Sequence, residues 1–273
     1  MMINKILIRY ILISLMGTIV FSSDINAIPN DSTFKTDLKI ELSALDILNN
    51  STSKLNGMNT SFICDLKVQS VSSEPIDYNF IFHSYWPNPD SLNYYNYIKF
   101  NSPIDYKNIE VWGHYHKKVL LKKKMPINNE ITIIENDSEN SNIINFFNFI
   151  ELVEEIKGGK FSINETKFKN KDIFLIKAKP DNPKAKKKST KFYIDKNDYS
   201  IYKIEWTNKK GQTSKTLLFK DWIIIDGINM SSKIIYEDIK NGTKLTCKLS
   251  QLELDNINQN IIDLINVGFK IEN

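Results

Sequence analysis

Apolar and polar residues alternate in one short run after another from Ser61 onward, the pattern of strands that bury only one face. Turn signals such as PNPDS and NSPID separate these runs. Similar runs resume after residue 159. The pattern predicts about eleven or twelve strands joined by hairpin-length loops. We therefore expect a mainly β (α+β) fold with a single, strongly curved antiparallel sheet.

The clearest part of the pattern is residues 221–254, where two Asx-Gly pairs each separate two strand-like runs. Asp226-Gly227 and Asn241-Gly242 are typical of two-residue hairpin turns, and such a turn at the second pair would place Tyr236 opposite Cys247. In this register one face of the meander is apolar: Ile223, Ile225, Ile228, Met230, Ile234, Tyr236, Leu245, Cys247 and Leu249. An open sheet with one apolar face must cover it with something.

Two segments have a helical pattern instead. Ser43 to Gly57 begins with a suitable N-cap and ends at a glycine. Ser141 to Gly159 carries apolar residues around well over half of its circumference, which is wider than a surface helix usually buries. This width favours either a helix buried on two sides or a lid whose second apolar face contacts a ligand.

The N-terminus has the order of an export signal. Lys5 and Arg9 precede an apolar run from Tyr10 to Phe21, and a polar stretch follows to Ala27. The run is shorter than the roughly 20 residues that a spanning helix needs. We expect residues 1–27 to be a cleaved signal peptide and residues 28–273 to be one exported domain. A retained membrane anchor is the alternative.

Charge and composition narrow the range of partners. Arg9 is the only arginine, so the chain without its signal has none and lacks the guanidinium fork used for bidentate phosphate and guanine recognition. We therefore expect no nucleic-acid partner. The densest basic run, Asn182 to Lys191, is typical of a solvated loop, with an anionic membrane surface as the alternative partner.

Cys64 and Cys247 both fall on the apolar faces of predicted strands. In an oxidising compartment the two could form a disulfide, but the sequence alone does not place them within bonding distance. Buried free cysteines are the alternative, since cysteine is a common core residue.

Catalytic chemistry is sparse in this chain. The sequence contains no Gly-rich phosphate loop, no G-x-S-x-G elbow, no H-E-x-x-H and no paired Cys motif. His114 and His116 share a face of one predicted strand and could form half a metal site, but no third ligand has a suitable spacing. We therefore expect a protein that is not an enzyme and that needs no metal or cofactor.

Three stretches taken together resemble the LolA-like outer-membrane lipoprotein-sorting family. They are YIKFNSPIDYKNIEV (Tyr97 to Val111), VLLKKKMP (Val119 to Pro126), and the segment from Phe192 to Leu245 with its ordered I-D-K, K-x-G, I-D-G and N-G-T turns. The resemblance implies a periplasmic, unclosed β-barrel with helices over its concave hydrophobic face. It also implies a cavity for acyl chains of lipoproteins or lipids, a membrane-bound donor transporter, an outer-membrane acceptor and a monomeric carrier.

Two features depart from the family pattern. The segment NFFNFIELVEEI is more apolar than its counterpart in many relatives, and the lid-closing arginine of the best-understood branch has no counterpart here. The identity of the cargo and the lid mechanism therefore stay open.

On this basis we expect a specific set of apolar residues to form the lid and the cavity. They are Phe146, Phe147, Phe149, Ile150, Trp206, Ile228, Met230, Ile234, Tyr236 and Leu245. Each of them could equally be an ordinary core residue. Three functions remain open: a carrier of lipoproteins or lipids, a periplasmic sensor or scaffold that binds a partner protein through the same face, and an exported structural protein with a packed interior.

Overall fold

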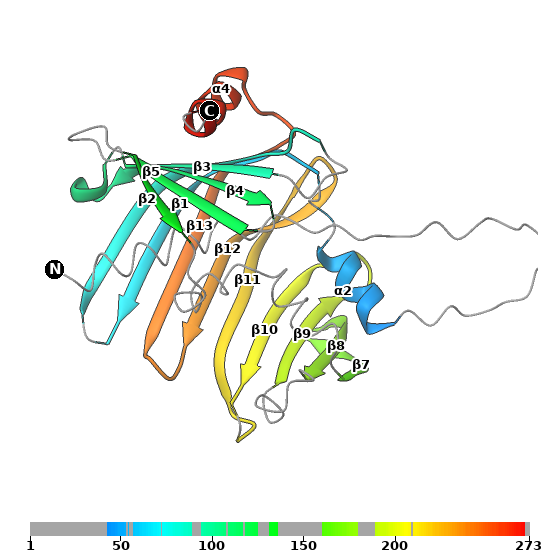
Figure 1. Cartoon of the computed structure of the whole chain (residues 1–273). Coiled ribbons are helices and arrows are strands. Elements are labelled where there is room, and N and C mark those ends of the chain that lie inside the picture. Colours follow the sequence, from blue (N-terminus) through cyan, green and yellow to red (C-terminus); the bar gives the residue numbers. More distant parts are fainter. Residues whose placement is uncertain are drawn as a thin grey trace, which may run out of the picture.

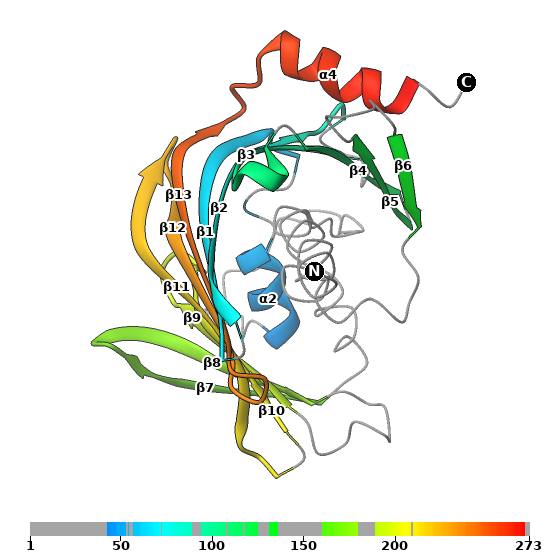
Figure 2. The same ribbon diagram turned by 90° about the vertical axis from the view of Figure 1, so that its left-hand side faces the viewer.

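A computed structural model shows one antiparallel sheet of thirteen described strands, which curves into an open half-barrel (Figures 1 and 2). The structure describes residues 43–52, 54, 57–71, 73–88, 94–107, 109–116, 118–124, 131–135, 160–179, 189–208 and 210–270. The strand order is β6-β5-β4-β3-β2-β1-β13-β12-β11-β10-β9-β8-β7. Strands β6 and β7 are therefore the edges of the described sheet, and the expected mainly β fold with a single curved sheet is confirmed.

The strands have the following bounds. They are β1 (Thr60–Ser70), β2 (Ser73–Tyr85), β3 (Tyr94–Ser102), β4 (Glu110–His116), β5 (Lys118–Lys124), β6 (Ile131–Glu135), β7 (Lys160–Phe168), β8 (Lys171–Lys179), β9 (Ser189–Asp195), β10 (Ile201–Thr207), β11 (Thr213–Ile225), β12 (Ile228–Asp238) and β13 (Thr243–Leu254). The helices are α2 (Ala44–Thr52), α4 (Gln259–Lys270) and the short 3₁₀ turn η2 (Ile104–Tyr106).

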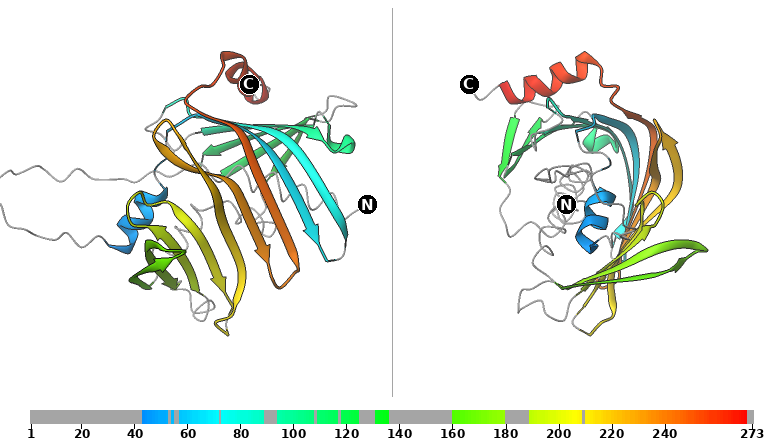
Figure 3. Two further views of the ribbon diagram at one scale, coloured as in Figure 1. Left: turned by 180° about the vertical axis from the view of Figure 1, so that it is seen from behind. Right: turned by 90° about the vertical axis from the view of Figure 1, so that its right-hand side faces the viewer.

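The two described α-helices lie on opposite sides of the sheet. Helix α2 lies on the concave side and α4 crosses the convex side (Figures 2 and 3). Ile265 of α4 is fully buried and packs with Tyr97 and Trp112. The indole Nε1 of Trp112 donates to the carbonyl oxygen of Leu264 at 3.2 Å, which ties α4 to β4.

Helix α2 begins as expected and ends earlier. Ser43 and Asp46 form a reciprocal cap, in which Ser43 N donates to Asp46 Oδ2 at 3.0 Å and Asp46 N donates to Ser43 Oγ at 3.2 Å. The predicted end at Gly57 is wrong, because the helix stops at Thr52. Its last residues are Asn, Asn, Ser and Thr, whose side chains compete with the helical backbone for hydrogen bonds.

The two Asx-Gly turns have different outcomes. Asp226-Gly227 forms the predicted two-residue turn, with Ile225 paired to Ile228 and positive φ angles of 48° and 79°. The predicted register at Asn241-Gly242 is wrong by two residues, because Asp238 pairs with Thr243 around a four-residue loop.

The carboxylate of Asp238 explains this longer loop. It accepts hydrogen bonds from N and Nδ2 of Asn241, at 3.1 Å and 2.8 Å, and so holds the wider turn closed. Tyr236 consequently faces Leu245 and not Cys247. A shift of two residues preserves the side of the sheet on which each residue lies, so the predicted apolar face is still correct.

The remaining differences from the sequence prediction concern one additional strand and two segments that the structure does not describe. Strand β6 was not expected from the sequence, because a five-residue run is too short to show clear alternation. The expected helix from Ser141 to Gly159 and the expected signal peptide at residues 1–27 lie outside the described residues. Within the described part of the chain, no helix is both long enough and apolar enough to span a membrane.

Candidate functional site

The concave side of the sheet carries the main hydrophobic core, which we call the concave core. Its buried members are Ala44, Ile47, Leu48, Phe62, Cys64, Leu66, Val68, Tyr78, Phe80, Phe82, Trp86, Tyr94, Ile98, Phe100, Ile109, Ile176, Ala178, Phe192, Ile194, Ile204, Leu217, Ile234, Tyr236, Leu245 and Cys247. They come from β1–β3, β8–β13 and α2, so one apolar surface extends across most of the sheet. Helix α2 on this side identifies it as the concave one (Figure 2).

Six of the predicted site residues lie on this concave side. Ile234, Tyr236 and Leu245 are less than a tenth exposed and belong to the concave core, and Trp206 packs against it half-buried. Ile228 and Met230 share the same face near the β11–β12 turn, where they are only half-buried. The other four predicted residues, Phe146, Phe147, Phe149 and Ile150, lie outside the described residues.

The predicted set omitted the aromatic part of the concave core on β1, β2 and β3. Phe62 stacks on Phe82 with ring centroids 4.7 Å apart, and Phe80 lies 5.4 Å from Phe100. The signal for these residues was present in the sequence, because the aromatic residues Tyr78, Phe80 and Phe82 recur at every second position of one predicted strand. Such aromatic pairs add attraction beyond simple area burial.

A row of small polar residues crosses the concave core. Thr60 of β1 pairs with Ser84 of β2, and Ser84 pairs with Asn96 of β3. All three are at most 2% exposed. They lie on the concave side because Phe62 and Phe82, two positions away along their strands, belong to the concave core. We call Thr60, Ser84 and Asn96 the polar row.

A polar contact just beyond the C-terminal end of helix α2 joins this segment to the sheet. The ammonium group of Lys54 donates to Ser200 Oγ at 3.1 Å and lies 3.9 Å from Asp198 Oδ2. Asp198 also accepts a hydrogen bond from Asn229 Nδ2 at 2.8 Å. Burial lowers the pKa of Lys54, and the charges of Asp198 and Asp195 oppose that effect. This contact joins α2 to the turn between β9 and β10.

The two cysteines lie inside the concave core as free thiols. They are on the adjacent strands β1 and β13, where Cys64 pairs with Leu249 and Cys247 pairs with Leu66. Burial raises the pKa of Cys64 well above its ordinary value, and a hydrogen bond with Cys247 adds to the effect. The structure therefore has buried thiols where the sequence left a disulfide open.

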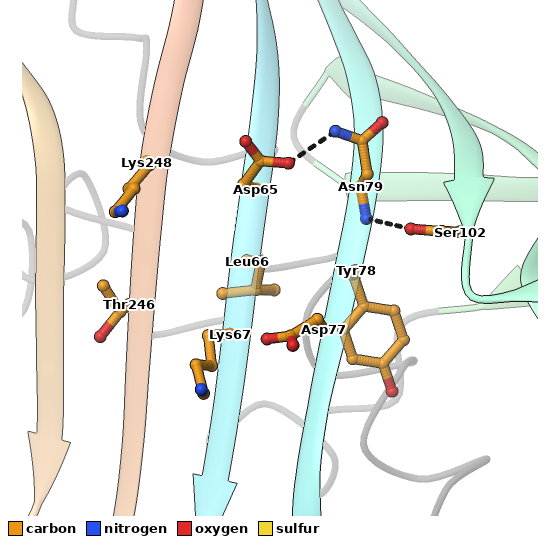
Figure 4. Close-up of a pocket in the computed structure, with 9 residues that line it drawn as sticks. All are labelled: Asp65, Leu66, Lys67, Asp77, Tyr78, Asn79, Ser102, Thr246 and Lys248. Carbon is orange, nitrogen blue, oxygen red and sulfur yellow. Dashed lines mark hydrogen bonds between the residues drawn. The ribbon is translucent and has the colours of Figure 1, made fainter.

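A separate hollow of about 310 Å³ lies over β13, β1 and β2 (Figure 4). Its charged lining residues are Asp65, Lys67, Asp77 and Lys248, of which Asp65 accepts a hydrogen bond from Asn79 Nδ2 at 2.7 Å. These residues alternate with the concave-core residues along their strands, so they belong to the convex face. The mixed charges make this hollow unlike the apolar face that the sequence predicted.

Buried acidic groups are engaged in structural contacts. Glu205 accepts hydrogen bonds from Lys203 Nζ and from Tyr193 Oη, the latter at 2.9 Å. Burial alone would raise the pKa of Glu205, but these hydrogen bonds and the nearby lysine charges outweigh it, so the pKa is lowered. Asp195 accepts a hydrogen bond from the hydroxyl of Tyr202.

Metal ligands do not gather in the described part of the chain. No group of three or more His, Cys, Asp or Glu residues is placed to hold an ion there. His114 and His116 are on β4 as predicted, and their side chains lie outside what the structure describes.

Comparisons with known proteins identify solved structures that have a similar fold. A model for a family described as "Uncharacterized protein" matches residues 159–264, and no curated protein matches the chain. A DUF1329 family protein from Desulfovibrio piger shares 14% identity with a TM-score of 0.63, and the alignment covers 79% of this chain and 93% of that one.

Two further solved structures have names that refer to lipoprotein sorting or LolA. An outer membrane lipoprotein-sorting protein domain from Vibrio parahaemolyticus has 16% identity and a TM-score of 0.60, covering 82% of this chain and 97% of its own. A LolA superfamily protein from Nitrosomonas europaea has 14% identity and a TM-score of 0.55, and the alignment covers 81% of this chain and 97% of that one. The curved sheet with its concave core is therefore a LolA-like fold, as the resemblance in the sequence implied.

Proposed function

We propose that the protein is a periplasmic carrier that binds acyl chains of lipoproteins or lipids on its concave face and ferries them towards the outer membrane. The observation that carries this proposal is the concave core, a continuous apolar surface contributed by nine strands and one helix. Burial of hydrocarbon is worth about 0.8 kcal/mol per methylene, so such a surface binds acyl chains in proportion to their length.

Binding requires the concave face to open. Residues such as Phe80, Phe82 and Ile98 are fully buried, and Ile47 and Leu48 of α2 belong to the same core. In the proposed cycle, α2 moves away when cargo enters and returns when cargo leaves. A membrane-bound donor and an outer-membrane acceptor would supply and receive the cargo, with the carrier acting as a monomer.

We further propose that this protein binds its cargo without chemically changing it. The buried carboxylates Asp195, Glu205 and Asp238 each have hydrogen-bond partners, which favours a structural role for them over acid–base chemistry. No cofactor is needed for a carrier that acts by hydrophobic burial and release.

Lipid extraction tests the proposal. We expect organic-solvent extracts of the purified protein to contain acyl lipids by mass spectrometry, and a fluorescent fatty acid to bind the delipidated protein. Met230→Glu introduces a charge on the concave side and should lower both signals. Ile224→Glu is the matched control, because Ile224 is 76% exposed on the opposite side of the same hairpin.

The alternative functions give other results in this experiment. A scaffold that binds a partner protein, or an exported protein with a permanently packed interior, would yield no acyl lipid and no fatty-acid binding. Either result would overturn the carrier proposal.

A further inference from the structure

Three buried hydrogen-bond donors around the start of β1 and the end of β2, on the concave side, have no hydrogen-bond partner among the residues that the structure describes. They are Oγ1 of Thr60, Oγ of Ser84 and Nε1 of Trp86. Their residues are only 1%, 0% and 4% exposed. Burying such groups without a partner is unfavourable, and native proteins seldom do so unless another molecule supplies the bond.

These groups lie together on the sheet. Thr60 and Ser84 are paired across β1 and β2, and Trp86 follows Ser84 by two residues on the same side. The stack of Phe62 on Phe82 lies next to Thr60 and Ser84 along their strands, and Trp86 itself stacks on Tyr94 with ring centroids 5.0 Å apart. The result is a narrow polar strip within an otherwise apolar surface.

The strip carries no charge. The buried charged residues in the described part of the chain are Asp195, Glu205 and Asp238, which are on β9, β10 and β12 in the other half of the sheet. An ionised group brought to the strip would lose its hydration without meeting a counter-ion. An uncharged acceptor would lose much less and would gain up to three donors.

We propose that Thr60, Ser84 and Trp86 bind the ester or amide carbonyl of an acylated ligand while its hydrocarbon chain lies along the concave core. This inference rests on the proposed carrier function and adds the ligand class: neutral acyl esters and amides in preference to free fatty acids. Hydrogen bonds from the two hydroxyls and the indole N–H fix the position of the ligand's polar group along the sheet.

Competition between probes of equal chain length tests this preference. Monolaurin, laurate and dodecane would each displace a bound fluorescent fatty-acid probe from the delipidated protein. We expect monolaurin to bind at least about tenfold more tightly than laurate or dodecane, since two additional hydrogen bonds of ordinary net strength are worth more than that ratio.

The double variant Thr60→Val, Ser84→Ala should lose this preference and retain its affinity for laurate and dodecane. Its urea midpoint should rise, because two unpartnered hydroxyls leave the core. A structural role for these hydroxyls predicts a lower midpoint instead. Thr246→Val on the convex side is the matched control and should change neither the preference nor probe binding.

Trp86→Phe is an independent variant that keeps an aromatic ring over Tyr94 and removes the N–H donor. It should weaken the binding of monolaurin and leave the binding of laurate and dodecane unchanged. Probe binding without preference for the ester, or a preference that survives both variants, would overturn this inference and leave the carrier function standing. Failure of every probe to bind the wild-type protein would overturn the carrier function itself.

Discussion

His83 lies on the convex side of β2, where its ring stacks on Tyr97 with centroids 6.2 Å apart. Burial lowers the pKa of His83 to about 4, and its Nδ1 has no hydrogen-bond partner within the described residues. The neutral imidazole is therefore the native form. Protonation would place a charge and an unpartnered N–H in a buried aromatic contact.

We expect this histidine to make folding sensitive to mild acid. The unfolded chain takes up a proton near pH 6.5 and the folded chain only near pH 4, so stability falls as the pH falls through this window. The loss is about 2 kcal/mol at pH 5, because each pKa unit corresponds to about 1.4 kcal/mol.

His83→Phe keeps the stack and removes the titration, so it should lose less stability than the wild-type protein between pH 7.5 and pH 5. Urea midpoints at the two pH values measure the difference. An unchanged pH dependence in the variant would show that other groups cause the acid sensitivity.

The polar row shows what a sequence reveals about single residues and what it does not. Alternation with Phe62 and Phe82 already places Thr60 and Ser84 on the apolar side of their strands. It does not indicate whether a neighbouring element supplies a hydrogen-bond partner, because that depends on contacts between residues distant in the chain. Only the structure shows these hydroxyls without such a partner among the described residues.

Among the elements, the two hairpins of the meander provide a matched pair of glycines. Gly242 has φ +61°, and a Cβ added there would lie 2.4 Å from Cγ2 of Val71. Gly227 has φ +79°, with nothing within 4 Å of such a Cβ. The first position is constrained by both conformation and space, and the second by conformation alone.

We expect Gly242→Ala to destabilise the protein by about 2 kcal/mol and Gly227→Ala by about 1 kcal/mol, which is the usual cost of a left-handed conformation. Urea denaturation of the two variants measures both values. Equal losses would mean that the β1–β2 turn around Val71 moves aside freely and does not hold the β12–β13 turn.

Helix α2 is the described element whose movement would uncover the concave core. Lys54→Met removes the contact with Ser200 and Asp198, so we expect a fluorescent fatty acid to enter several-fold faster in stopped-flow measurements. The urea midpoint should change little, because the two side chains are 24% and 36% exposed and the contact is worth less than about 1 kcal/mol.

Lys196→Met is the control for this variant. Lys196 belongs to the same β9–β10 turn, but its ion pair at 2.7 Å is with Glu165 of β7 and not with the segment that follows α2. Two outcomes would contradict the idea that Lys54 holds α2 in place over the concave core. One is an equal increase in the rate of fatty-acid entry in both variants, and the other is an unchanged rate in Lys54→Met.

Elements were predictable where the local pattern was strong and no side chain competed with it. The Asp226-Gly227 turn, which lies between two clearly alternating runs, forms as predicted. The register at Asn241-Gly242 was not predictable from the dipeptide alone, because Asp238 stabilises a longer loop from outside it. Helix α2 ended early for a comparable reason: weak helix formers follow its last apolar turn.

In the whole molecule, the sheet is completed by a pairing that no local pattern reveals. Strand β13, near the C-terminus, pairs with β1, near the start of the described chain, and Cys64 thereby comes beside Cys247. This pairing joins the aromatic surface of β1–β3 to the predicted apolar face of the meander. The candidate site is consequently wider than the sequence indicated, and its aromatic half was missed.

The tryptophans report on the two sides of the sheet separately. Trp86 and Trp206 belong to or pack against the concave core. Trp112 lies under α4 on the convex side, and Trp222 is paired with Ser231 on the side of β11 opposite to the concave core. A quencher carried on an acyl chain therefore distinguishes binding on the concave face from adsorption elsewhere.

Quenching by a brominated acyl lipid is the most direct measurement of the central claim. With Trp112→Phe and Trp222→Phe combined, fluorescence comes from the concave pair, and we predict strong, saturable quenching. With Trp86→Phe and Trp206→Phe combined, it comes from the convex pair, and we predict almost none. Equal quenching of both proteins, or quenching of the convex pair alone, would contradict a carrier that holds acyl chains on its concave face.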